Sequence, residues 1–220
     1  MLIKCFGAAL QGIDAVIVTI EVHAVSGYDF TLVGLPDNAV KESRERIMSA
    51  IAVNGYGKPK HTLTINMAPA DIRKEGAAYD LPLAIGVLAA EEEVRKVDLE
   101  NFLIMGELSL DGSLHPIKGA LPIALAARRE GFKGIILPAE NAREAAVVEG
   151  LEVYGLHELQ EVVRLLNGVQ TFAPTRVDVN EEFRRYAFPS DLDFSDVCGQ
   201  ENVRRAVEVA AAGGHNLLMI

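Results

Sequence analysis

Side chains that could act as nucleophiles or metal ligands are present in this chain of 220 residues, but their spacing argues against both roles. Ser43 and Ser109 have no neighbouring base that would activate a hydroxyl, so each is expected to be a surface or hairpin residue. Cys5 and Cys198 have no CxxC partner. The histidines show no HxH or HxxxH spacing, and we predict no metal site; they are His23, His61, His115, His157 and His215.

Cationic side chains in two loops are candidates for binding a phosphate backbone. Lys58 and Lys60 lie in "GYGKPKHTL", and Arg73 and Lys74 lie in "ADIRKEG". Loops on a rigid scaffold often carry binding residues, so we predict DNA contacts from these four; the alternative is charge that only aids solubility. The net charge of −10 argues against a protein that binds nucleic acid through its overall charge.

The remaining charged residues have simpler explanations. Asp80 opens the apolar stretch 80–90, where N-capping of a helix is the default role and a buried carboxylate is the alternative. Arg44 and Arg46 lie among glutamates of one helix and are expected to form pairs on its surface.

The first half of the chain predicts strands and two helices that position these residues. Asp37 is a good N-cap for a helix with an apolar stripe, whereas residues 80–90 are apolar all round and predict a buried helix. Strands are expected near the N-terminus and at 13–24, 28–36 and 62–69; the stripe is Val40, Ile47, Ala50 and Ile51.

In the second half of the chain, the pattern changes to a hairpin followed by alternating helices and strands. Residues 102–117 predict a hairpin with Asp111-Gly112 as its two-residue turn. Helices and short strands then alternate up to residue 167, the helices at 119–130, 139–147 and 157–168 and the strands at 134–138 and 151–156. A β-rich half followed by βα units predicts an α+β, or mixed α/β, fold with helices packed on a mixed sheet.

The end of the chain predicts a separate unit. Residues 168–190 lack periodicity and are expected to form a linker, which places a first domain at 1–167 and a second unit at 191–220. In that unit a helix is followed by "HNLLMI", an apolar run typical of a strand buried in a parallel sheet. Such a strand leads into the phosphate-binding loop of P-loop ATPases, although a plain edge strand fits the pattern equally well.

Two resemblances sharpen these expectations. The stretch "DVCGQENVRRAVEVAAAGGHNLLMI" resembles the opening of an AAA+ module of the magnesium-chelatase type. The resemblance implies that Gly199 and Gln200, with Val197 and Cys198, lie near the adenine of ATP. It also implies that the chain is truncated before its Walker A loop.

Residues 105–141 and 33–56 resemble Lon protease domains, whose fold is that of ribosomal protein S5 domain 2. A Lon-like domain followed by this AAA+ opening is identified as the layout of the ComM, or magnesium-chelatase-like, ATPase family.

The Lon resemblance does not extend to the reactive residues. The position of the nucleophilic serine falls on about Ala78, and that of the catalytic lysine falls near Leu121. Tyr79 is a poor nucleophile because a phenol ionises near pH ~10. Lys118 lies three residues before Leu121 and is expected to point elsewhere. We therefore predict no catalytic residue and reject proteolysis.

The family resemblance implies a hexameric, ATP- and Mg²⁺-dependent DNA helicase that promotes branch migration in natural transformation and recombination. ATP, Mg²⁺ and DNA are expected to bind the full-length ring, and this segment alone is expected to be inactive. A magnesium chelatase motor subunit is the alternative. Two distant cysteines and the lack of a long apolar run predict a cytoplasmic protein that is not in a membrane.

Overall fold

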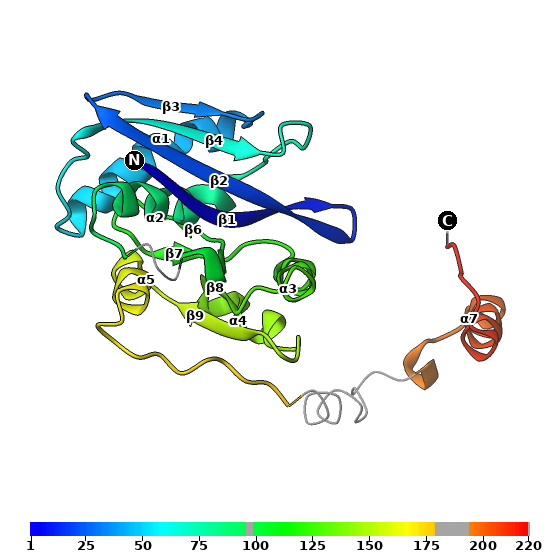
Figure 1. Ribbon diagram of the computed structural model, residues 1–220. Helices are drawn as coiled ribbons and strands as arrows, with labels where there is room; N and C mark the ends of the chain where they lie inside the picture. Colours follow the sequence, from blue (N-terminus) through cyan, green and yellow to red (C-terminus); the bar gives the residue numbers. More distant parts are fainter. Residues whose placement is uncertain (96–98, 179–193, 220) are drawn as a thin grey trace. The chain divides into compact units, whose positions relative to one another are not determined.

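The computed structural model describes residues 1–95, 99–178 and 194–219, which separate into two compact units, Met1–Val177 and Asp178–Ile220. The first unit is built on one seven-stranded sheet with the strand order β3-β4-β2-β1-β5-β8-β9 (Figure 1). This confirms the predicted mixed α/β fold. The strands are β1 Leu2–Gln11, β2 Asp14–Ser26, β3 Phe30–Val33, β4 His61–Ala68, β5 Phe102–Ile104, β8 Gly134–Pro138 and β9 Glu152–Leu156.

The two halves of the sheet have different pairing. β2 runs antiparallel to both β1 and β4, whereas β5, β8 and β9 run parallel to one another and to β1. The central parallel strands β5 and β8 are buried on both faces, as their uninterrupted apolar sequences require. The antiparallel strands alternate, so that Lys4 and His23 remain exposed on one face while the other face is covered.

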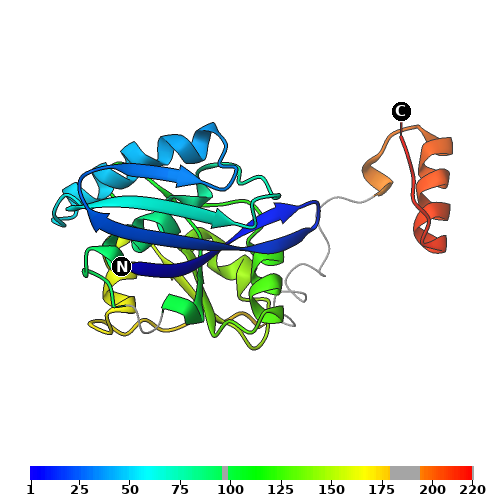
Figure 2. The same ribbon diagram turned by 45° about the horizontal axis from the view of Figure 1, so that its top comes forward.

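Helices α1 (Asn38–Val53) and α2 (Asp80–Ala90) cover that face (Figure 1 and Figure 2). All of α2 is buried, as its sequence predicts. The helix can approach the sheet closely because Gly86 has no side chain; a Cβ there would lie 2.8 Å from Val22. Asp37 caps α1 by accepting a 2.8 Å hydrogen bond from the amide of Val40, which confirms its predicted role.

Three further helices follow in the first unit. These are α3 (Ala120–Arg129), α4 (Ala139–Ala145) and α5 (Leu159–Leu166). α4 packs on β8 and β9, whereas α3 contacts β2 as well as β1 and β8. Phe6 of β1 meets Phe132, which follows α3, edge to face at 5.2 Å between ring centroids. Beyond α5 the chain returns along β9, where the amide of Thr175 donates to the carbonyl of Val153 at 2.7 Å.

The predicted hairpin at 102–117 is only partly correct. Phe102–Ile104 joins the main sheet as β5, and the hairpin consists of β6 (Glu107–Leu108) and β7 (Leu114–His115). The turn between them spans five residues rather than two, and Asp111 and Gly112 lie within it. An apolar strand of a parallel sheet and one arm of a hairpin look alike in sequence, which explains the error.

The second unit contains η3 (Phe194–Asp196) and the predicted helix, α7 (Glu201–Gly213). The expected strand after it is not formed, since residues 215–219 have neither helical nor strand structure. A strand needs a neighbour for its main-chain hydrogen bonds, and residues 194–219 provide none. Of the predicted linker, residues 179–190 lie outside the described part of the chain.

Candidate functional site

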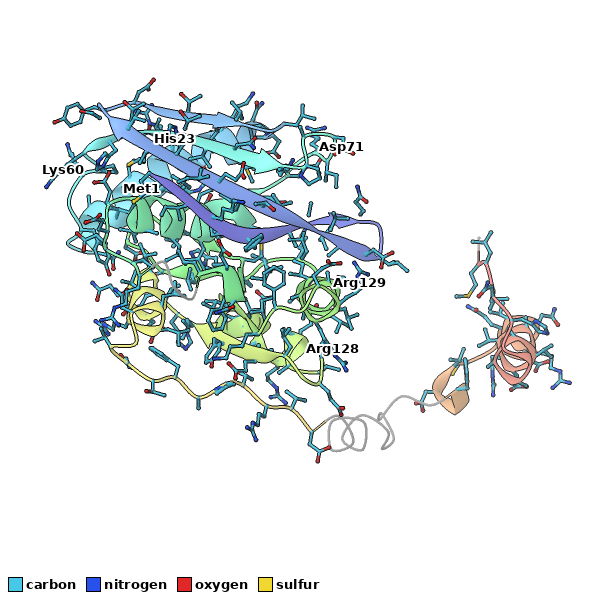
Figure 3. The ribbon with its side chains drawn as sticks, viewed as in Figure 1. Met1, His23, Lys60, Asp71, Arg128 and Arg129 are labelled. Carbon is cyan, nitrogen blue, oxygen red and sulfur yellow. The ribbon has the colours of Figure 1, made fainter. Side chains whose placement is uncertain are left out.

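A pocket of about 720 Å³ opens beside the end of β1 in the first unit. Its walls come from residues 8–11 of β1, from the segment 72–79 that leads into α2, and from residues 116–118 before α3. In Figure 3 the β1–β2 hairpin extends between the loop that carries Asp71 and the helix that carries Arg129. The pocket is therefore built from segments that are distant in sequence.

Both positions of the expected protease pair can be located relative to this pocket. Ala78, at the nucleophile position, lines it and contributes only a methyl group. Leu121, at the lysine position, is not part of its lining; it lies in the first turn of α3, where its amide donates to Glu144 at 2.9 Å. Neither side chain can attack or accept a proton, so the pocket lacks the chemistry of a Ser-Lys dyad.

Tyr79 is the residue next to the nucleophile position and carries an aromatic hydroxyl. Its side chain is 2% exposed and its hydroxyl donates to the carbonyl of Ala8 at 2.9 Å. Burial raises the pKa of this phenol well above its ordinary value, with a smaller contribution from Asp37. Tyr79 thus fastens the start of α2 to β1 and cannot replace the missing nucleophile.

Lys118 is among the residues that line the same pocket as Ala78. The residue is exposed and lies just before Gly119, whose left-handed φ of +74° turns the chain into α3. This turn brings the segment 116–118 to the pocket wall.

Asp80 does not cap α2, since Tyr79 occupies the capping position and Asp80 lies in the first turn. Its fully buried carboxylate accepts from Nε and Nη2 of Arg46 at 2.6 and 2.9 Å and from the amide of Leu108 at 3.3 Å. Burial raises the pKa of Asp80, and Arg46 opposes that rise. The predicted surface pairing of Arg46 with neighbouring glutamates is wrong, because Arg46 reaches across to α2 and joins the two helices.

The four basic residues proposed for DNA contact do not form one surface. Lys58 and Lys60 are exposed before β4, and Arg73 is exposed after it, where it pairs with Glu75 at 3.2 Å. The ends of β4 lie roughly 23 Å apart at the usual rise of about 3.3 Å per residue. Figure 3 shows Lys60 and Asp71 at these opposite ends.

Lys74 is removed from the candidates, because its side chain is fully buried and its ammonium donates to the carbonyl of Pro69. The segment 72–76 folds back here, and Lys74 also forms a main-chain bridge with Pro36. A phosphate contact needs an accessible cation, and Lys74 does not offer one.

The serines have local partners. Ser43 is buried on α1 and its hydroxyl donates to the carbonyl of Val40 at 2.6 Å, so it is not a surface residue. Ser109 contacts Nε2 of His115 across the β6–β7 hairpin, a base that its sequence context did not reveal. Both side chains lie outside the lining of the pocket.

The residues expected near adenine are consecutive in the turn before α7. Val197 is 38% exposed, and Cys198, Gly199 and Gln200 are exposed as well. Gly199 and Gln200 both have left-handed φ angles, of +72° and +52°, and Gln200 is the N-cap of α7. The phosphate-binding sequence GxxxxGK[ST] does not occur in these 220 residues. That these four residues border adenine stays a prediction of the family resemblance.

No cluster of three or more potential metal ligands from His, Cys, Asp and Glu occurs within residues 1–95, 99–178 and 194–219. In the same ranges, every helix is too short or too polar to cross a bilayer. Cys5 is buried, which raises the pKa of its thiol to about 12.

The first unit has the Lon-like mixed α/β fold, with Ala78 and Leu121 at the two positions that the Lon resemblance assigns to the reactive pair. Among known proteins, residues 20–141 match the family described as subunit ChlI of Mg-chelatase, and residues 193–220 match the family described as magnesium chelatase, subunit ChlI. Lon protease 2 of Bacillus subtilis is 29% identical over 146 residues, 64% of this chain and 26% of its own length.

Two other relatives are more similar to this chain than the Lon protease is. Competence protein ComM of Haemophilus influenzae is 39% identical over 216 residues, which cover 98% of this chain and 42% of that protein. The uncharacterized protein YifB of Salmonella typhimurium is 42% identical over 215 residues, 96% of this chain and 41% of its own length. The chain belongs to the ComM, or magnesium-chelatase-like, family of AAA+ proteins, and it spans about two fifths of the length of these relatives.

Proposed function

We propose that this chain is the non-proteolytic Lon-like domain, with the start of the AAA+ module, of a hexameric ATP-dependent DNA helicase that promotes branch migration in recombination and natural transformation. The observation that carries the proposal is the combination of a Lon-like pocket with Ala78 at the nucleophile position and a relative named as a competence protein along 98% of the chain.

In this proposal the first unit supplies subunit contacts and guides DNA, while ATP and Mg²⁺ act in the AAA+ module. ATP binding between neighbouring subunits would change their fit, and loops on the ring would move the phosphate backbone. Lys58, Lys60 and Arg73 remain the candidates for that contact, as two separate sites at opposite ends of β4. The turn 197–200 would border the adenine.

The test is strand displacement from a forked DNA duplex by the full-length protein with ATP and Mg²⁺. We expect displacement that requires both, and the same protein should leave casein intact. A full-length protein that hydrolyses ATP but neither binds nor unwinds forked DNA would contradict the proposal.

A magnesium chelatase motor subunit is the second candidate, favoured by the descriptions of both matching families. Insertion of Mg²⁺ into protoporphyrin by the full-length protein, together with the other chelatase subunits, would support it. The relative named as a competence protein, which matches 98% of this chain, favours the DNA motor.

A further inference from the structure

The basic loop, residues 57–60, carries Lys58 and Lys60, two of the remaining candidates for DNA contact. Its residues have neither helical nor strand structure. Gly57 has no side chain to pack, and Pro59 has no amide to donate. Within the described part of the chain, these four residues make only one hydrogen bond. It runs from the amide of Lys60 to a carboxylate oxygen of Glu91, at 3.0 Å.

Glu91 holds the chain at a second point, directly beside this loop. The same carboxylate oxygen lies 2.9 Å from Nδ1 of His61, the first residue of β4. An ionised carboxylate can only accept, so the Lys60 amide and the imidazole both donate to it. The side chain of Glu91 is only 13% exposed, whereas that of His61 is 42% exposed. One shielded oxygen therefore fastens two consecutive residues.

The main chain at Glu91 is itself fixed, because Glu91 is the C-cap of α2. The amide of Glu93 donates to the carbonyl of Leu88 at 2.9 Å, and that of Glu92 donates to Ala89 at 3.3 Å. Glu92 has a left-handed φ of +66°. This is the Schellman arrangement that ends many helices. Since α2 is buried along its whole length, Glu91 stands on a rigid support.

Packing beneath the basic loop is incomplete. A cavity of about 70 Å³ is lined by residues 57–60 and by Ile51 of α1 and Val87 and Leu88 of α2. Atoms that border a cavity have no contact partners on that side, so dispersion forces hold the loop only weakly there. The hydrogen bond to Glu91 therefore has a large share in fixing the position of the loop.

Glu93 is a natural comparison for Glu91. It lines the same cavity, but its side chain is exposed and, among the residues that the structure describes, has no hydrogen bond or ion pair. Electrostatics alone would make the two glutamates equivalent, because each places a negative charge near the two lysines and repels phosphate. Removal of either would then strengthen DNA binding. A difference between the two glutamates measures the effect of the hydrogen bonds.

We propose that Glu91 is a positioning residue for DNA binding, which holds the basic loop so that Lys58 and Lys60 are presented to the phosphate backbone before DNA arrives. A loop that is already ordered loses less conformational entropy when it binds. Glu91 acts only through the loop, since a carboxylate repels phosphate. This inference rests on the proposed DNA function, because it concerns one of the two basic sites at the ends of β4.

The affinity of the full-length protein for fluorescein-labelled forked DNA, measured by fluorescence anisotropy, tests this role. Glu91→Ala removes the acceptor together with a negative charge, and Glu93→Ala removes the charge alone. We expect Glu91→Ala to bind roughly 3- to 10-fold more weakly than Glu93→Ala. Glu91→Gln keeps an oxygen that can accept from the Lys60 amide and should restore most of that loss. Equal affinities of the two alanine variants, or no recovery in Glu91→Gln, overturn the positioning role.

A double-mutant cycle shows whether Glu91 acts through the two lysines. When Lys58 and Lys60 are both changed to alanine, Glu91→Ala and Glu93→Ala should bind forked DNA with equal affinity, because the loop no longer carries a cation to position. A difference between the two glutamate variants that persists in this background would mean that Glu91 affects DNA binding by another route, and it would contradict the proposal.

Hydrogen exchange without DNA tests the hydrogen bond independently of the DNA function. The amide of Lys60 should exchange faster in Glu91→Ala than in the wild type, whereas Glu93→Ala should leave its rate unchanged. Unchanged exchange in Glu91→Ala overturns the inference even if the wild type binds DNA. Failure of the wild type to bind forked DNA overturns the proposed function and this role with it, whereas wild-type binding with equal affinities of the alanine variants overturns the positioning role alone.

Discussion

The hydroxyl of Tyr79 donates a hydrogen bond of 2.9 Å to the carbonyl of Ala8. Tyr79 directly follows Ala78, the position that the Lon resemblance assigns to the nucleophile. The bond joins the start of α2 to the strand that borders the pocket. The hydroxyl lies close to the expected reactive position, but its role is structural. Its proton is used in this hydrogen bond, and the side chain is buried.

Tyr79→Phe tests that role. The substitution removes the donor and leaves a buried carbonyl without a partner, which typically costs about 1–3 kcal/mol. We expect the free energy of unfolding in urea to fall by about that amount. Tyr28→Phe is the matched control, because Tyr28 is 86% exposed and should change stability by less than about 0.5 kcal/mol. Equal effects of the two substitutions would argue against the structural role.

The buried pair of Arg46 and Asp80 joins α1 to α2 and also holds the amide of Leu108. Asp80→Ala leaves a guanidinium that is only 24% exposed without its partner, so we expect stability to fall by about 3 kcal/mol or more. Glu75→Ala breaks the exposed pair with Arg73 and should cost less than about 1 kcal/mol. Urea unfolding measures the stability of both variants. Similar decreases in the free energy of unfolding would mean that burial does not strengthen the pair of Arg46 and Asp80.

Lys74 predicts a pH dependence of stability. Burial lowers the pKa of its ammonium, partly opposed by Asp71. Between the lowered folded pKa and the unfolded value of about 10.4, the unfolded chain binds more protons, so this residue makes stability rise with pH. Below the folded pKa its contribution is constant. Wild type should therefore gain stability relative to Lys74→Met between pH 7 and about 10. A stability difference that stays flat or falls over this range would contradict the assignment.

Local sequence patterns predicted most of the first unit. The cap at Asp37, the all-apolar α2 and the short strands at 134–138 and 151–156 depend on neighbours within one element, and the structure has each of them. β5 was misjudged because its partners, β1 and β8, are distant in sequence. The prediction of a strand at the end of the chain was wrong for a related reason. A strand depends on a pairing partner, and residues 194–219 do not contain one.

The site was less predictable because its determinants are contacts between distant residues. Ala78 and Leu121 were assigned by resemblance, and of these two only Ala78 lines the pocket. The partner of Asp80 lies 34 residues away, and nothing local distinguishes Arg46 from its exposed neighbour Arg44. Lys74 has the sequence of an exposed loop residue, yet the fold of its segment buries it.

The two basic sites at the ends of β4 should act independently on DNA. In the full-length protein, the double change Lys58→Glu and Lys60→Glu should weaken binding to forked DNA and lower the slope of log affinity against log salt by about 1 for each phosphate that the protein no longer neutralises. Arg73→Glu should weaken binding further, because its end of β4 is remote. Lys41→Glu provides a control for the change in net charge. Unchanged affinity in the double variant would remove the first site.

DNA-dependent ATP hydrolysis by the full-length protein tests the central claim most directly, namely that this Lon-like domain belongs to a DNA motor. Phosphate release should be measured with Mg²⁺, with and without forked DNA, over a range of DNA concentrations. We predict that the rate rises with DNA and saturates. A rate that is indifferent to DNA would contradict the account.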